Sequence, residues 1–269
     1  MDPKRIQVGN RSINVFDHGS GEALLLVHGF PLDHRMWRNQ FQLSKHFRVI
    51  APDLPGFGES ESDTTEMSMA GMADDLASIL EALQITEPVT YCGLSMGGYI
   101  GWEFWNRHRH RISRFVACDT RAGNDTEQVA RARKIAAQSV EKTGSQTVAD
   151  AMIDKLFHQP THPTQSESAQ DVHRVISGTE PRSIAAGQLA MSVRADATPM
   201  LQDFNIPTLL VVGEFDSITT PQEMREMATA IPGATFVEIK QAGHMPPLEN
   251  PAEFNSQLMS FMTRQAIGS

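Results

Sequence analysis

The chain of 269 residues carries a formal net charge of -9, and 40% of its residues are apolar. This length and apolar content suit one α/β domain with an insertion. The negative charge argues against nucleic acid or an anionic membrane as a partner, and the sequence has no apolar run long enough to cross a bilayer.

Short apolar runs bounded by turn residues predict strands in the first part of the chain. The expected strands cover 6–8, 12–16, 23–27 and 47–52. The turn signal Gly9-Asn10-Arg11 makes the first two of them an antiparallel pair. A helix is expected over 36–46, and a loop rich in Gly and Pro follows from Asp53 to Ser60.

Helices and strands continue to alternate through the middle of the chain. Apolar residues recur at three- and four-residue spacing over 69–83, which predicts the buried face of a helix. A strand ending at Gly93, a helix continuing over 99–109 and a strand over 112–119 follow. The basic residues at 107–111 fall at the end of that helix, where cations interact favourably with the helix dipole.

This alternation breaks between about Arg121 and Thr198, where no strand-like apolar run occurs. The expected helices in this segment cover 126–142, 148–157, 168–176 and 184–194. The alternation then resumes with strands at 208–213 and 235–239 and helices at 221–230 and 251–264. We therefore expect a core domain of residues 1–120 and 199–269 with a helical cap at 121–198.

The cysteines and the N-terminus suggest a location for the protein. Cys92 and Cys118 fall at the ends of predicted buried strands, so we interpret them as small core residues in a reducing compartment rather than as a disulfide. No apolar segment typical of a signal peptide follows Met1. We expect a cytoplasmic protein.

The segment Gly93-Leu94-Ser95-Met96-Gly97 carries the strongest chemical signal in the chain. A strand precedes this Gly-x-Ser-x-Gly motif and a helix follows it. So sharp a reversal strains the serine backbone, requires glycine on both sides and leaves the Ser95 hydroxyl exposed above the sheet. The first N–H groups of the new helix favour negative charge there, which predicts a nucleophile beside half of an oxyanion hole.

A serine nucleophile needs a general base that is itself oriented by an acid. His244, on a Gly/Pro loop directly after the last predicted strand, is the best candidate for the base. Asp216, just after the strand at 208–213, is the favoured acid, because the order Ser, Asp, His is the one expected of this architecture. Glu214 and Asp119 are its rivals.

The second half of the oxyanion hole needs a main-chain N–H opposite that of Met96. Gly29 lets the chain turn so that the N–H of Phe30 can point inward. His28 is interpreted as a residue that holds loops together through hydrogen bonds. The pairs His158/His162 and His108/His110 have loosely metal-like spacing but lack accompanying carboxylates or thiolates, so neither a metal nor another cofactor is expected.

Five stretches of the sequence together resemble the signature segments of the α/β-hydrolase superfamily. They are His28-Gly29-Phe30-Pro31, Asp53 to Ser60, Gly93 to Gly98, Gly213-Glu214-Phe215-Asp216 and Gly243-His244. The resemblance implies a mostly parallel eight-stranded sheet with helices on both faces and a helical cap. It implies Ser95 as nucleophile, Asp216 as acid, His244 as base and the N–H groups of Phe30 and Met96 as oxyanion hole. The segments 31–37 and 119–122 resemble the branch of enol-lactone hydrolases, small carboxylesterases and perhydrolases.

We expect a serine hydrolase that cleaves a small carboxylic ester or lactone through an acyl-enzyme. Carbon–carbon bond hydrolysis and cofactor-free perhydrolysis use the same three residues and remain alternatives. A non-catalytic receptor for a small molecule is the alternative from another class. Dehalogenases and epoxide hydrolases of this superfamily attack with Asp, so Ser95 argues against them. The sequence leaves the acyl group, the alcohol, the ring size and the oligomeric state open.

Overall fold

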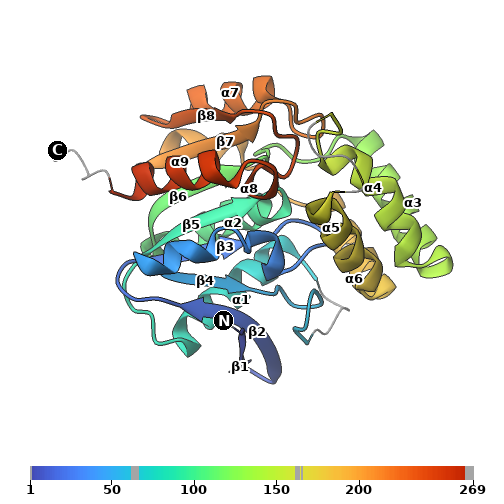
Figure 1. The fold of residues 1–269 in the computed structure, drawn as a ribbon, viewed down its shortest axis with the longest axis horizontal. Coiled ribbons are helices and arrows are strands. Elements are labelled where there is room, and N and C mark those ends of the chain that lie inside the picture. The colour runs from blue at the N-terminus through green and yellow to red at the C-terminus, as the bar shows by residue number, and fades with distance from the viewer. Residues whose placement is uncertain (1, 62–66, 161–163, 165, 264–269) are drawn as a thin grey trace.

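The computed structural model describes residues 2–61, 67–160, 164 and 166–263. Within them, one sheet has the strand order β1-β2-β4-β3-β5-β6-β7-β8 (Figure 1). The strands are β1 (Lys4–Val8), β2 (Arg11–His18), β3 (Ala23–Val27), β4 (Arg48–Pro52), β5 (Val89–Leu94), β6 (Ile112–Cys118), β7 (Thr208–Gly213) and β8 (Thr235–Ile239). The pairs β1/β2 and β2/β4 are antiparallel, and the remaining pairs are parallel. The mostly parallel eight-stranded sheet is confirmed.

Helices cover both faces of the sheet. Those on one face are α1 (Met69–Ala82), α2 (Met96–His108) and α7 (Pro221–Ala230), and those on the other include the 3-10 helices η1 (His34–Trp37) and η2 (Phe41–Lys45) and helix α9 (Pro251–Thr263). Strand β3 is buried throughout, and its side chains alternate between two cores. Leu25 and Val27 face the first core, while Leu24 and Leu26 face the second. None of the described helices is long and apolar enough to cross a bilayer.

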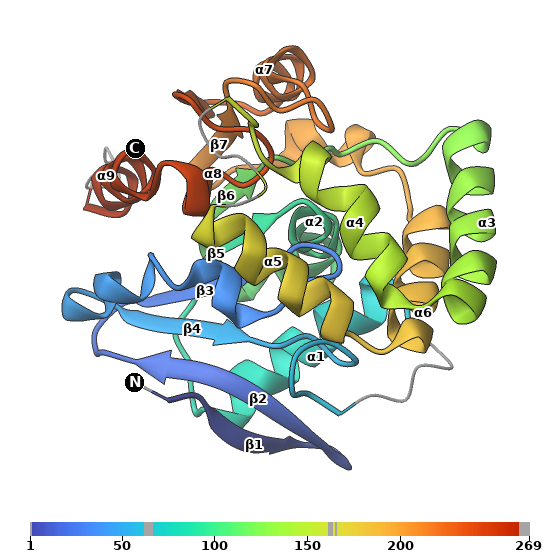
Figure 2. The same ribbon diagram turned by 45° about the vertical axis from the view of Figure 1, so that its right-hand side comes forward.

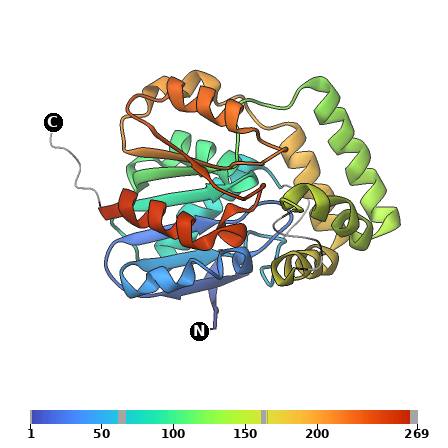
Figure 3. The ribbon, with the colours of Figure 1, turned by 45° about the horizontal axis from the view of Figure 1, so that its top comes forward.

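Four α-helices lie between β6 and β7 in the described part of the chain, as the sequence predicts. They are α3 (Glu127–Thr143), α4 (Ser145–Leu156), α5 (Glu167–Gly178) and α6 (Pro181–Ser192). Helix α3 packs against α6, and α4 packs against α5. All three ribbon views show the four helices gathered at one end of the sheet (Figures 1, 2 and 3). They lie where the parallel strands end, which is where ligands bind in open α/β sheets.

The helix expected over 36–46 is wrong, because the chain there forms η1 and η2 instead. Between them, the buried side chain of Gln40 donates hydrogen bonds to the carbonyl oxygen of Pro247 at 3.1 Å and to Asn255 at 2.9 Å. The ring of Phe41 stacks on that of Phe16, with centroids 3.6 Å apart. These long-range contacts override the local helical pattern, and short 3-10 turns accommodate them.

Among the described residues, three shorter elements were not predicted. They are η4 (Arg109–Arg111), η5 (Thr198–Asp203) and α8 (Pro246–Glu249). Arg264, expected at the end of the last helix, lies outside the described residues, as does His162. The basic residues that end α2 have specific partners beyond the helix dipole, since Arg107 and His108 both pair with Asp74 of α1.

Candidate active site

Ser95 stands at the turn between β5 and α2 with φ of 54° and ψ of -111°. Positive φ is uncommon for a residue other than glycine and marks backbone strain. A Cβ on Gly93 would overlap the main chain of Gly97, and a Cβ on Gly97 would overlap the carbonyl oxygen of Val27. The main-chain N–H of Ser95 donates to the carbonyl oxygen of Cys118 at 2.9 Å. Neighbouring strands therefore hold the strained turn in place while the serine stays partly exposed.

Asp216 and His244 form a buried pair. Nδ1 of His244 lies 2.7 Å from Oδ2 of Asp216, and the two residues are 2% and 3% exposed, respectively. The other carboxylate oxygen of Asp216 accepts from the N–H groups of Ile218 at 2.8 Å and Thr219 at 3.1 Å. With the Nδ1 proton donated to Asp216, Nε2 of the neutral ring presents a lone pair that can accept a proton.

The rival acid Glu214 does not contact His244 through any hydrogen bond of the described residues. Its carboxylate accepts from Nζ of Lys240 at 3.2 Å and from the N–H of Gln241 at 3.1 Å. The hydrogen bond to the Gln241 N–H and the Lys240 ammonium lower the pKa of Glu214. Glu214 therefore contacts the two residues that directly follow β8 and not the imidazole of His244.

Asp119 lies beside the Asp216–His244 pair without bonding to the ring. One carboxylate oxygen accepts from the N–H of Gly213 at 2.8 Å, and the other is buried with no hydrogen-bond partner among the described residues. One side-chain oxygen or nitrogen atom from each of Asp119, Asp216 and His244 lies within 4.8 Å of the other two. Burial, and then the adjacent Asp216 carboxylate, raise the pKa of Asp119 well above its usual value. Asp119 is therefore a second acid near the pair that favours its neutral form.

The N–H groups of Phe30 and Met96 donate to no protein acceptor among the hydrogen bonds of the described residues. The loop that carries Phe30 touches the nucleophile's turn, since a Cβ on Gly29 would lie 3.5 Å from Cβ of Ser95. Helix α6 contacts the same loop, because a Cβ on Gly187 would lie 2.7 Å from Cε2 of Phe30. Both predicted donors are thus available at the two elements that border Ser95.

His28 joins two loops, as its sequence context suggested. Its Nδ1 lies 2.9 Å from the carbonyl oxygen of Gly29, and its Nε2 accepts from the N–H of Leu54 at 3.0 Å. This pattern requires a neutral ring with the proton on Nδ1. Burial lowers the pKa of His28, which favours that neutral form.

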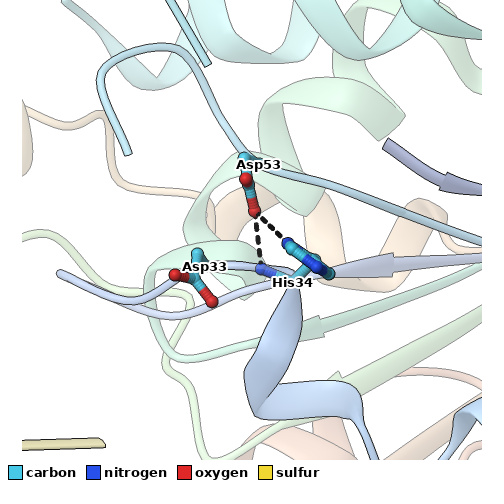
Figure 4. A group of neighbouring side chains, drawn as sticks. All are labelled: Asp33, His34 and Asp53. Atoms are coloured by element: carbon cyan, nitrogen blue, oxygen red, sulfur yellow. Dashed lines mark hydrogen bonds and ion pairs between the residues drawn. The ribbon is translucent and has the colours of Figure 1, made fainter. Parts of the chain in front are cut away.

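A second buried acid–histidine cluster was not predicted: Asp33, His34 and Asp53 (Figure 4). Oδ1 of Asp53 lies 2.6 Å from Nδ1 of His34 and accepts from the His34 N–H at 2.8 Å. Its other oxygen accepts from Asn14 and from the N–H of Glu59. Because both oxygens already accept two hydrogen bonds, we interpret the cluster as a structural brace for the loop that begins at Asp53.

Sequence reasoning also missed Glu249, whose buried carboxylate accepts hydrogen bonds from residues on both sides of His244. The available signal was a single carboxylate in the otherwise apolar segment 245–249, a few residues after a predicted site histidine. The short helix α8 brings this carboxylate back toward the histidine. The sequence did not predict α8, because the segment begins with two consecutive prolines.

Ser95 follows β5 and His244 follows β8, at the same edge of the sheet but with β6 and β7 between these two strands. The hydrogen bonds of the described residues join His244 to Asp216 and to the carbonyl oxygen of Leu156, and none joins its ring to the Ser95 hydroxyl. Site hydrogen bonds are often long in unliganded enzymes and shorten when substrate binds.

Comparison with known proteins points to one family. A family model described as the alpha/beta hydrolase fold matches residues 22–251. A thermophilic esterase from Thermogutta terrifontis superposes with a TM-score of 0.93 and 37% identity, over 97% of this chain and 98% of that one. An enol-lactonase from Burkholderia xenovorans superposes with a TM-score of 0.89 and 28% identity, over 97% and 100%. A pimeloyl-[acyl-carrier protein] methyl ester esterase from Vibrio cholerae is 27% identical over 91% of this chain and 96% of its own length.

Proposed function

Because the chain belongs to the alpha/beta hydrolase fold family, we propose that it is a serine hydrolase that cleaves a small carboxylic ester or lactone. The observation that carries this proposal is the 2.7 Å contact between Asp216 and His244, formed at the same edge of the sheet as the strained turn that presents Ser95. A solvated serine on a Gly-rich turn would need no buried histidine–carboxylate pair near it.

In the proposed reaction, Nε2 of His244 takes the proton of the Ser95 hydroxyl as its oxygen attacks the carbonyl carbon. The N–H groups of Phe30 and Met96 stabilise the developing oxyanion. Protonated His244 then donates its proton to the departing alkoxide, which leaves an acyl group on Ser95. In the second half, His244 activates water, and hydrolysis of the acyl-enzyme restores the serine.

Asp216 serves this cycle by holding one tautomer of His244 and by stabilising the imidazolium. That task requires a carboxylate that stays ionised. The N–H groups of Ile218 and Thr219 donate to its second oxygen and so fix the orientation of the carboxylate toward the ring. Asp119, which favours its neutral form, is poorly suited to the same task.

We also propose that residues 121–198 act as a cap over the site. Two contacts support this role. The main-chain N–H of His244 donates to the carbonyl oxygen of Leu156 at the end of α4, at 2.9 Å. Gly187 of α6 packs against the ring of Phe30. The cap therefore touches both the proposed base and the proposed oxyanion hole.

The substrate class rests on the relatives. The similar proteins described above are named as two esterases and an enol-lactonase, and both names denote hydrolysis of an ester bond. We keep the prediction of a cytoplasmic location. The buried thiols of Cys92 and Cys118 support it, since their Sγ atoms lie 3.8 Å apart in a weak hydrogen bond and both cysteines are free rather than joined in a disulfide.

Hydrolysis of p-nitrophenyl acetate and butyrate, followed by a panel of lactones of graded ring size, tests the proposal. We expect turnover by the parent protein and its loss in Ser95→Ala. Binding of a small molecule without turnover of any ester would favour a receptor instead.

A further inference from the structure

Glu249 is a buried carboxylate that accepts three main-chain hydrogen bonds beside His244. Its residue is 6% exposed. Oε2 accepts from the N–H of Gly243 at 2.9 Å and from the N–H of Met245 at 3.0 Å, so it holds the residues directly before and after the histidine. Oε1 accepts from the N–H of His158 at 2.7 Å. One side chain therefore fixes the main chain on both sides of the imidazole.

The same contacts tie the histidine loop to the end of α4. His158 lies just beyond that helix, and the N–H of His244 donates to the carbonyl oxygen of Leu156. A Cβ on Gly243 would lie 2.9 Å from the nitrogen of His158, so the two segments are in close main-chain contact. The loop and the helix end are thus locked together, with the carboxylate of Glu249 between them.

A buried carboxylate is costly unless hydrogen bonds compensate it. Burial raises the pKa of Glu249, and the N–H groups of His158, Gly243 and Met245 act against that rise. Two of these donors flank the one side chain whose orientation the proposed chemistry depends on. That placement distinguishes Glu249 from a carboxylate that only fills a gap in the core.

We propose that Glu249 is a positioning residue for His244. Asp216 holds the ring through Nδ1, whereas Glu249 holds the main chain from which the ring projects, so that Nε2 stays directed toward Ser95. This inference rests on the proposed function, because the base must be held within a fraction of an ångström of its productive place. Glu249 itself need not touch the substrate.

The test is Glu249→Gln, which keeps the size of the side chain, removes its charge and turns one acceptor into a donor that faces N–H groups. Glu253→Gln is the matched control. Glu253 also accepts a main-chain N–H, from Lys240 at 3.0 Å, but its partners lie outside the segment 243–245. With p-nitrophenyl butyrate, we expect kcat to fall about 10- to 100-fold in Glu249→Gln with KM nearly unchanged, and no change in Glu253→Gln.

The pH profile separates positioning from a general loss of structure. The charge of His244 lowers the pKa of Glu249, so the two groups interact electrostatically. Loss of the carboxylate in Glu249→Gln should therefore move the acid limb of kcat/KM to lower pH. The other carboxyl groups that face the histidine, Asp216 and Asp119, are unchanged in the variant. A folded Glu249→Gln protein with parental kcat and an unmoved acid limb would overturn the inference.

A second measurement does not depend on turnover. In the parent protein, the amide hydrogens of Gly243 and Met245 should exchange slowly with solvent, and in Glu249→Gln at least about 10-fold faster. Rapid exchange of both amides in the parent overturns the inference, even where the variant does not fold. A parent that hydrolyses no ester contradicts the proposed function instead, and amide exchange then decides the role of Glu249.

Discussion

Nδ1 of His244 lies 2.7 Å from a carboxylate oxygen of Asp216, whereas the nearby Asp119 makes its hydrogen bond to the N–H of Gly213. Both acids follow strands of the same sheet edge, and both are buried. Because their partners differ, we propose different tasks for the two acids, and replacing each with Asn separates these tasks.

Asp216→Asn should fold normally and lower kcat by about 10⁴, the effect of the same change in the triad of serine proteases. An amide in place of the carboxylate can donate to the ring, which favours the wrong tautomer and no longer stabilises the imidazolium. Steady-state hydrolysis of p-nitrophenyl butyrate measures the loss, and circular dichroism confirms the fold. Nearly parental activity would show that the acid is misassigned.

Asp119→Asn should leave kcat within a few-fold of the parent, because the amide oxygen can still accept from Gly213 and the amide nitrogen can donate toward Asp216. The raised pKa of Asp119 means that the folded chain binds its proton more tightly than the unfolded chain does. The contribution of Asp119 to the stability of the parent therefore falls as pH rises above 3.8, the ordinary pKa of this carboxyl group.

Urea unfolding between about pH 4 and pH 8 tests this linkage. As pH rises, the free energy of unfolding of the parent should decrease relative to that of Asp119→Asn. A stability difference that is constant across this range, or a crippled kcat in Asp119→Asn, would contradict the assignment of a neutral acid.

Gly97→Ala should be strongly destabilising, because its Cβ would overlap the carbonyl oxygen of Val27. Overpacking of this kind costs about 1–3 kcal/mol or more, and displacement of the turn should lower kcat by at least about 100-fold. Gly178→Ala is the control, since no atom lies within 4 Å of the Cβ it would add. Thermal unfolding and ester hydrolysis of the two variants should differ sharply. Equal effects would mean that the turn tolerates a side chain.

Asp53 should contribute to acid stability. Burial raises its pKa, but the hydrogen bond and charge of His34, with the N–H groups of Glu59 and His34, outweigh burial and lower it to about 2. A carboxyl group with a lowered pKa stabilises the fold above its ordinary value of 3.8 and loses that contribution as pH falls through its folded pKa. The shift corresponds to about 2 kcal/mol.

Urea unfolding of the parent and of Asp53→Asn therefore should show a stability gap above about pH 4 that narrows as pH falls toward 2. Glu226→Gln, a change on the exposed face of α7, serves as the control and should show no such narrowing. A gap independent of pH would show that His34 does not hold Asp53 in its ionised form.

The sheet could be predicted because each of its strands carries a local signal. The uninterrupted apolar run of β3 and the turn at Gly9 depend on neighbouring residues alone, so no tertiary information was needed. Ser95, Asp216 and His244 could be proposed for a related reason, since each directly follows a predicted strand, and the ends of parallel strands meet at one edge.

What sequence reasoning missed depends on contacts between distant segments. Residues 36–46 have a helical pattern, but Gln40 hydrogen-bonds to Pro247 and Phe41 stacks on Phe16, and both partners are distant in the sequence. Glu249 contacts the main chain beside His244 only because α8 folds back and brings its carboxylate to the N–H of Gly243. The bond between Asp53 and His34 likewise joins two loops that no periodicity connects.

The most direct test of the central claim is to find the acyl group on Ser95. Reaction with p-nitrophenyl butyrate is quenched with acid during turnover, and the peptides are mapped by mass spectrometry. We predict a butyryl adduct on the peptide that contains Ser95, accumulating with a burst of p-nitrophenol and absent from Ser95→Ala. Hydrolysis that persists in Ser95→Ala, or an adduct confined to another residue, would contradict the account.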